Sequence, residues 1–180
     1  MMEIVLASGI GYGHTTLSAF DAALKEVGIH NFNLLKLSSV IPIGAEVKVV
    51  PHYCPGPGEH GYLLYVVLAE TRTDRPRTGI AAGLGWYQLA DGRGVFAEHS
   101  EQAEGLRSAE LERGVTHKLR STIQDLCSHR GWSFDERLLC CQVASCQVEE
   151  RPASVLVTAV YESRPFAGLE SSQEGQGGQR

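Results

Sequence analysis

The sequence predicts a single α+β domain, a layered sandwich of mainly antiparallel sheets covered by two principal helices. About eight segments are rich in β-branched and aromatic residues and are bounded by turn residues, which is typical of strands. Only two segments have a helical period and are long enough to cover a sheet. Most of the strand-like segments follow one another directly, which favours antiparallel pairing over a doubly wound parallel sheet.

The first predicted elements are a strand over residues 3–8, a glycine-rich loop over 9–14 and a helix. Thr15 or Thr16 can cap this helix, and Gly28 can end it because glycine tolerates left-handed backbone. Its apolar positions at helical spacing are Leu17, Phe20, Leu24 and Val27. The third glycine of the loop falls one place short of the GxGxxG register, so we expect a tight turn or a loop that approaches a ligand rather than a dinucleotide site.

The rest of the chain supplies the other strands and the second helix. Residues 32–37 are expected to form a strand that runs directly into Ser38 and Ser39. Further strands are expected at 46–50, 62–69, 80–89, 95–98, 138–148 and 154–161, and a helix at 108–129. The prolines and glycines of residues 52–61 indicate a loop. Residues 1–166 then form one domain, and the polar segment 167–180 is expected to be a disordered tail.

Composition narrows the class of function. The chain has 180 residues, 43% of them hydrophobic and 21% charged, as in an ordinary globular protein. A net charge of −5 argues against a nucleic-acid partner. No segment has the roughly 20 apolar residues of a membrane helix, and the start of the chain does not resemble a signal peptide, so we expect a cytoplasmic protein without a membrane partner. Five cysteines without a CxxC pair indicate buried reduced thiols rather than disulfides or a zinc site.

Three polar residues stand out against apolar surroundings. Asp21 is four residues after Leu17 and three before Leu24, so a helix places it on the apolar stripe, where a carboxylate needs a partner. Asn33 interrupts an apolar strand. Glu98 ends another strand on the same face as Phe96, either against apolar surface, where the acid form can donate a proton, or pointing into solvent. The histidines form no compact ligand pair, so no metal site is expected.

Four motifs occur together along the chain: FDAAL at 20–24, NLLKLSSVIP at 33–42, GVFAEH at 94–99 and RGWSFDERL at 130–138. In these motifs the chain closely resembles the pyruvoyl-dependent arginine decarboxylase family, in which a Ser-Ser-hydrophobic-hydrophobic-Pro sequence is the self-cleavage site. The resemblance extends from about Val5 to Tyr161.

The resemblance implies a function and a role for each matching residue. Ser39 would attack the Ser38 carbonyl, and elimination and loss of ammonia would leave a covalent pyruvoyl group at residue 39, on an α chain 39–180 associated with a β chain 1–38. This group replaces pyridoxal phosphate, and no metal is implied. Glu98 matches the acid that reprotonates the substrate carbon, Asn33 an active-site asparagine, and Asp21 the carboxylate that holds the substrate guanidinium. The implied reaction converts L-arginine to agmatine and CO2, in polyamine synthesis or acid resistance.

One distance constrains this site. Asn33 and Ser39 are six residues apart, which is about 20 Å in an extended strand. Both residues can line one pocket if the backbone turns between them or if the site is shared between subunits, and the second arrangement agrees with the homotrimer that the resemblance implies. Two alternatives stay open: the same machinery acting on another amino acid such as histidine, and a non-cleaving trimeric binding or regulatory homologue.

Overall fold

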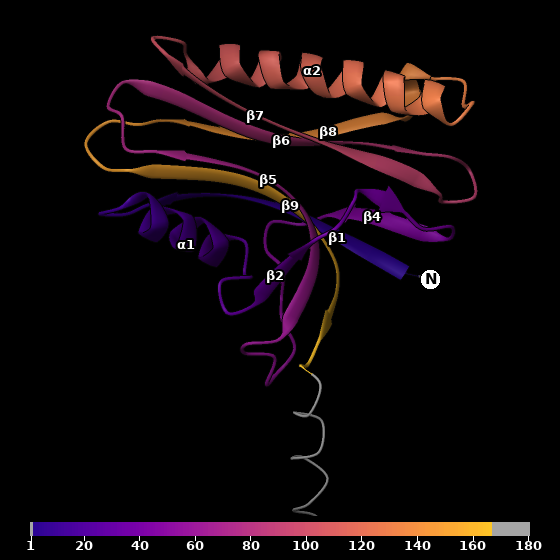
Figure 1. The fold of residues 1–180 in the computed structure, drawn as a ribbon, viewed down its shortest axis with the longest axis horizontal. Coiled ribbons are helices and arrows are strands. Elements are labelled where there is room, and N and C mark those ends of the chain that lie inside the picture. Colours follow the sequence, from indigo (N-terminus) through magenta and orange to yellow (C-terminus); the bar gives the residue numbers. More distant parts are fainter. Residues whose placement is uncertain (1, 167–180) are drawn as a thin grey trace, which may run out of the picture.

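The computed structural model describes residues 2–166, so the tail predicted at 167–180 lies outside the described residues. Two β-sheets are stacked face to face, with one helix on each outer face (Figure 1). Helix α1, Thr16–Glu26, covers the five-stranded sheet, and helix α2, Ser108–His129, covers the four-stranded sheet. This is the predicted α+β layered sandwich.

The five-stranded sheet has the order β2-β5-β9-β1-β4. Its strands are β1 (Met2–Tyr12), β2 (Asn33–Lys36), β4 (Ala45–Val49), β5 (Leu63–Thr73) and β9 (Ala153–Arg164). The central pairs β1–β9 and β5–β9 are antiparallel, whereas the two outer pairs, β1–β4 and β2–β5, are parallel. The mainly antiparallel pairing is confirmed, and the two short parallel edges make this sheet mixed.

The four-stranded sheet has the order β3-β7-β6-β8 and is entirely antiparallel. Its strands are β3 (Val40–Ile41), β6 (Thr78–Gln88), β7 (Gly94–Glu104) and β8 (Leu139–Gln147), and a short 3-10 turn, Glu136–Leu138, precedes β8. The two-residue strand β3 is not among the predicted strands. Strand β7 is also longer than predicted and runs six residues beyond Glu98.

Alternation along the strands divides the core into three layers. Ile4 and Leu6 of β1 face the other sheet, and Ala7 faces α1. The same division holds on β9, where Val157 packs between the sheets and Leu156 packs under α1. A third cluster lies between the four-stranded sheet and α2. A one-residue slip of a strand would move its side chains from their own layer to the opposite face of the sheet. The alternation along the strands therefore fixes the register of both sheets.

The glycine-rich segment is not a loop, and this prediction is wrong. Strand β1 continues to Tyr12, and Gly9 and Gly11 lie beneath α1. A Cβ atom built on Gly11 would overlap the backbone of Ala19 and Ala23. These glycines therefore allow the helix to pack closely on the strand. The helix begins at the predicted cap, Thr15, whose side chain accepts a hydrogen bond from the Ser18 N–H.

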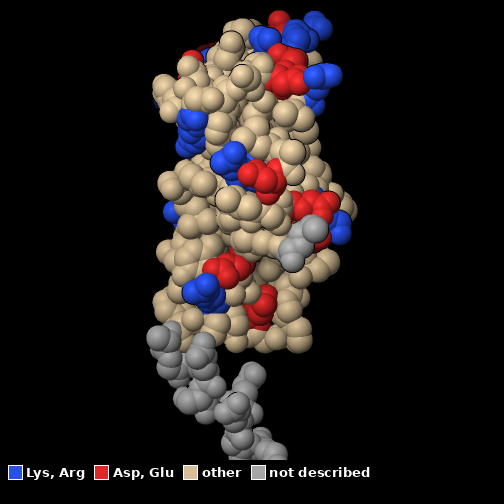
Figure 2. Space-filling model, turned by 90° about the vertical axis from the view of Figure 1, so that its right-hand side faces the viewer, with Lys and Arg blue, Asp and Glu red and all other residues tan. Residues whose placement is uncertain are grey.

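Charged residues are mixed in sign on the face seen in Figure 2, where Lys and Arg lie beside Asp and Glu between wide uncharged areas. Exposed ion pairs of the described chain include Lys48–Glu3 and Arg93–Asp91. No helix of the described residues is long and apolar enough to cross a membrane. The expected burial of the cysteines holds only in part: Cys127 and Cys146 are buried, Cys54 and Cys140 are exposed, and all are free thiols.

Candidate active site

Ser38 and Ser39 lie where the chain crosses from one sheet to the other. Strand β2 ends at Lys36 in the five-stranded sheet, and β3 begins at Val40 in the four-stranded sheet. The Leu37 N–H donates to the Val66 carbonyl at 2.9 Å, and the Phe96 N–H donates to the Ser39 carbonyl at 2.8 Å. The segment 37–39, which contains the peptide between the two serines, is therefore held from both sheets.

Ser39 has a backbone conformation that is unusual for serine. Its φ is 69°, and Arg77 is the one other non-glycine residue of the described chain with a positive φ. The left-handed region costs a non-glycine residue about 1–2 kcal/mol, so it persists where the surroundings fix it. Residue 39 is therefore strained at the position where the sequence predicts the reaction.

Glu98 is the direct partner of the Ser39 side chain. The Ser39 hydroxyl donates to Glu98 Oε1 at 2.5 Å. Glu98 lies on β7, two residues from Phe96, whose side chain packs in the layer between the sheets, and the predicted shared face is confirmed. Burial, together with the Glu98 charge, raises the pKa of the neighbouring Tyr161 phenol. Glu98 is thus the side chain that bonds to the Ser39 hydroxyl, and it is exposed, as in the second of the two predicted alternatives.

A cavity of about 270 Å³ opens beside the two serines. One wall is formed by Phe96, Ala97 and Glu98 of β7, and the opposite wall comes from the C-terminal half of α2. The α2 residues are Thr122, Leu126 and Arg130. A second cavity of about 320 Å³ reaches Glu98 from the open edge of the sandwich and is lined by Lys36, Glu70 and His99. A small molecule can therefore reach the Ser39–Glu98 pair.

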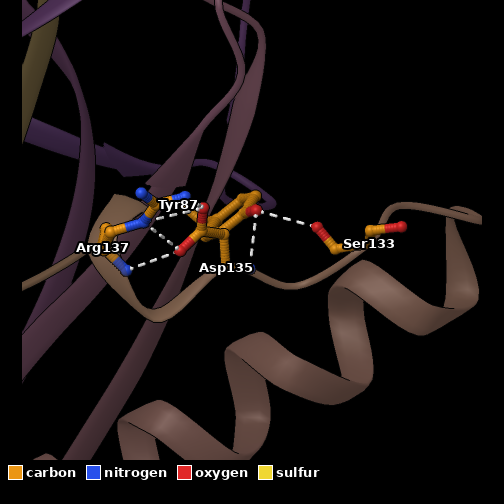
Figure 3. Close-up of polar contacts among 4 residues, drawn as sticks. All are labelled: Tyr87, Ser133, Asp135 and Arg137. Carbon is orange, nitrogen blue, oxygen red and sulfur yellow. Dashed lines mark hydrogen bonds and ion pairs between the residues drawn. The ribbon is translucent and has the colours of Figure 1, made fainter.

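The motif at 130–138 anchors the end of α2 to the four-stranded sheet. The Tyr87 hydroxyl donates to the Ser133 carbonyl at 3.0 Å and accepts from the Asp135 N–H at 3.1 Å (Figure 3). Phe134 stacks on the Tyr87 ring with centroids 5.7 Å apart. Asp135 is in turn paired with Arg137 at 2.7 Å. This motif fixes the helix end that forms one wall of the cavity.

Asn33 and Asp21 lie away from Ser39 within one chain. Asn33 is the first residue of β2, whereas Ser39 lies beyond the other end of this strand. The Asn33 side-chain amide donates to the Gly61 carbonyl at 2.8 Å. Asp21 is exposed on α1, on the outer face of the five-stranded sheet. No hydrogen bond within residues 2–166 links Asn33 or Asp21 to Ser39 or Glu98.

The prediction that Asp21 lies on the apolar stripe of α1 is wrong. The buried face consists of Ala19, Ala23 and Leu24, whereas the Leu17 side chain is 69% exposed. Because the glycines of β1 admit close packing, the helix presents its small residues to the strand and turns Leu17 and Asp21 outward. The substrate-binding role of Asp21 is left as a prediction.

Tyr161 is a residue near the site that sequence reasoning did not select. Its hydroxyl donates to the Val40 carbonyl, next to Ser39, at 3.0 Å. The sequence signal is weak, because the apolar alternation of β9 predicts an inward-facing side chain at 161 but does not indicate what that side chain contacts.

Comparison with known proteins agrees with this geometry. Residues 3–165 match the family model described as pyruvoyl-dependent arginine decarboxylase (PvlArgDC). A pyruvoyl-dependent arginine decarboxylase of Halobacterium salinarum is 30% identical over 165 residues, which cover 92% of this chain and 98% of the relative. The protein of that name from Thermococcus sibiricus is 33% identical over 161 residues, covering 88% and 93%. That from Methanopyrus kandleri is 49% identical over 54 residues, covering 30% and 36%.

Proposed function

Because the chain belongs to the pyruvoyl-dependent arginine decarboxylase family, we propose that it converts L-arginine to agmatine and CO2 with a pyruvoyl group made from its own Ser39. The observation that carries the proposal is the Ser39 hydroxyl, which donates to Glu98 at 2.5 Å from a residue held in the left-handed region. A hydroxyl bonded to a carboxylate, on a strained peptide fixed from both sides, is the arrangement that an activated serine nucleophile requires.

These contacts support self-cleavage. Glu98 accepts the Ser39 hydroxyl proton while Oγ bonds to the Ser38 carbonyl carbon. The Ser38–Ser39 C–N bond then breaks as the proton passes to the nitrogen, which leaves an ester and a free amine at residue 39. Loss of the Ser39 Cα proton expels the Ser38 carboxylate with Oγ. Water then replaces the nitrogen at Cα, and ammonia leaves. The products are a chain 1–38 with a new C-terminus and a chain 39–180 that begins with the pyruvoyl group.

The residues around Ser39 fit this group. The Phe96 N–H already holds the carbonyl of residue 39, which cleavage does not remove. Glu98 contacts the side chain of residue 39, and the 270 Å³ cavity gives access to it. When present, the pyruvoyl group supplies a carbonyl that condenses with the substrate amine and accepts the electrons released with CO2. Glu98 is then placed to deliver a proton to the carbon that has lost CO2.

The other end of the substrate requires residues that one chain does not bring to Ser39. Asp21 is exposed on α1 and Asn33 begins β2, away from the Ser39–Glu98 pair. We assign Asp21 to the substrate guanidinium, since an exposed carboxylate on a neighbouring subunit can accept its two parallel N–H bonds. A homotrimer of cleaved protomers with shared sites accounts for both positions. We also place the enzyme in the cytoplasm, where the free thiols of its five cysteines persist.

The mass of the denatured protein tests the proposal. Cleavage yields two chains that correspond to 1–38 and 39–180, the longer one lighter by one ammonia, whereas Ser39→Ala stays intact. Agmatine formation from arginine, measured beside histamine formation from histidine, then identifies the substrate. A full-length chain that is still uncut after prolonged incubation, and that does not react with a carbonyl-trapping amine, would overturn the enzyme assignment in favour of a binding subunit.

A further inference from the structure

Tyr161 occupies an irregular position in the sheet that lies over the Ser39 segment. Along β5 and β9, Tyr65 pairs with Glu162 and Val66 pairs with Val160, so Tyr161 is the extra residue of a β-bulge. Bulges interrupt the ladder and re-aim a side chain, and they are enriched next to active sites. Here the extra residue has its ring among the side chains packed between the sheets.

The contacts of Tyr161 converge on the residue that follows Ser39. Its hydroxyl donates to the Val40 carbonyl at 3.0 Å, while its ring meets the Phe96 ring edge-on with centroids 6.4 Å apart. The Phe96 N–H holds the Ser39 carbonyl at 2.8 Å. Two successive carbonyls, those of Ser39 and Val40, are thus fixed by two residues that also pack on each other.

The surroundings of Tyr161 keep its hydroxyl protonated. Burial raises the pKa of the phenol, and the negative charge of Glu98 raises it further. The hydroxyl is therefore kept as a hydrogen-bond donor to the Val40 carbonyl. Glu98 is the charged group that acts on the phenol, whereas the exposed Glu162 and Arg164 of the same strand pair with each other at 2.8 Å.

We propose that Tyr161 is a positioning residue for the chemistry at residue 39: its hydroxyl anchors Val40 and thereby holds Ser39 in the left-handed conformation that presents its side chain to Glu98. The inference rests on the proposed self-cleavage. In the cleaved protein the same bond holds the α chain directly behind its first residue, so Tyr161 acts both on the processing of Ser39 and on the alignment of the group made from it.

The test is Tyr161→Phe, which keeps the ring and removes the donor. We expect the first-order rate constant of cleavage, followed by denatured mass, to fall about ten-fold, as loss of one neutral hydrogen bond would do if it acts fully in the transition state. The pH at which cleavage is half-maximal is expected to stay unchanged, because the hydroxyl positions the reacting residue and does not exchange its proton. In protein that has finished cleaving, kcat falls while the KM for arginine does not change.

Tyr53→Phe is the matched control, since it removes the hydroxyl of a tyrosine that packs in the layer between α1 and the five-stranded sheet and does not line the Ser39 cavity. It is expected to leave the rate of cleavage unchanged. Equal cleavage rates in wild type and Tyr161→Phe would overturn the positioning role, and a shifted pH midpoint would replace it with proton transfer. An uncut wild-type chain would instead refute self-cleavage itself.

A second variant keeps the test valid if Tyr161→Phe does not fold. Site-specific 3,5-difluorotyrosine at 161 preserves the ring and the hydroxyl but lowers the phenol pKa, so the donor is lost at alkaline pH. Cleavage of this variant is expected to slow as the pH rises, whereas cleavage of the wild type does not. Identical pH profiles for the two proteins would contradict the proposal.

Discussion

Replacement of Glu98 by glutamine separates proton acceptance from hydrogen bonding at Ser39. In the native chain the Ser39 hydroxyl donates to Glu98 Oε1 at 2.5 Å, within the range of a charge-assisted O–H···O⁻ bond. A glutamine oxygen can accept the same hydrogen bond but cannot take the proton. The substitution therefore preserves the shape and most of the contacts of the site, and it removes the proposed base.

The expected loss follows from the share of the barrier that a positioned base removes. General base catalysis contributes about 10²–10⁴-fold, or roughly 3–5 kcal/mol of activation free energy. We expect Glu98→Gln to slow the appearance of the 1–38 and 39–180 chains by this factor. The backbone strain at Ser39 and the bond from the Phe96 N–H are unaffected, so slow cleavage should persist.

The assay is a time course of denatured intact mass on freshly purified protein, with carbonyl labelling as a second measure of the product. Glu101→Gln is the matched control. Glu101 is three residues further along the same strand, so it faces α2, where it pairs with Lys118 at 3.5 Å. Glu101→Gln removes the same charge by the same glutamate-to-glutamine change, but Glu101 does not contact Ser39. This variant should therefore cleave at the rate of the wild type.

If Glu98→Gln cleaves as fast as the wild type, Glu98 is not the base for Ser39, whatever its later role toward the substrate. Equal slowing in Glu98→Gln and Glu101→Gln would show that net charge, and not the contact at 2.5 Å, controls the reaction.

Three further changes test the substrate site, the packing and the pH dependence. Asp21→Asn should lower arginine turnover by orders of magnitude and leave self-cleavage intact, and slowed cleavage would contradict a role confined to the guanidinium. Gly11→Ala places a methyl group against the backbone of Ala19 and Ala23, so it should destabilise the protein by more than about 2 kcal/mol in chemical denaturation. The hydrogen bond from Arg137 lowers the pKa of Asp135 from 3.8 to about 2, so the stabilisation from this pair is complete above pH 3.8 and is lost as the pH falls toward 2. Melting curves of wild type and Asp135→Asn should accordingly converge at pH 2 and differ at pH 5.

The sequence was sufficient to predict the sandwich, because two helical periods and a series of alternating strands determine which faces are buried. The face that Glu98 shares with Phe96 follows from the same alternation. The position of Asp21 does not, since a helix with small residues on one side and large apolar residues on another can bury either face. The glycines of β1, interpreted as a loop, in fact decide which face of α1 packs against the sheet.

The geometry at Ser39 also could not be predicted from the sequence. Strand β3 has two residues, too few for a periodic signal, yet it moves the chain into the second sheet. Ser39, with its positive φ, lies in a segment held by the Leu37 N–H bond to Val66 and by the Phe96 N–H bond to Ser39, and both partners are distant in the chain. Such long-range contacts do not leave a local pattern, and for the same reason the bulge at Tyr161 could not be predicted.

The position of the proposed cut explains how the chain can be cleaved within its folded domain while the two products stay associated. Residues 1–38 would provide β1, α1 and β2, and β1 lies between β9 and β4, both of which belong to residues 39–180. It pairs with β9 from Val5 to Tyr12 and with β4 from Met2 to Leu6. The cut removes only the crossing between the two sheets, where residue 39 is strained, and leaves every ladder of the five-stranded sheet intact. The two chains should therefore remain together in native buffer and separate only when that sheet unfolds, because release of the shorter chain requires removal of a central strand.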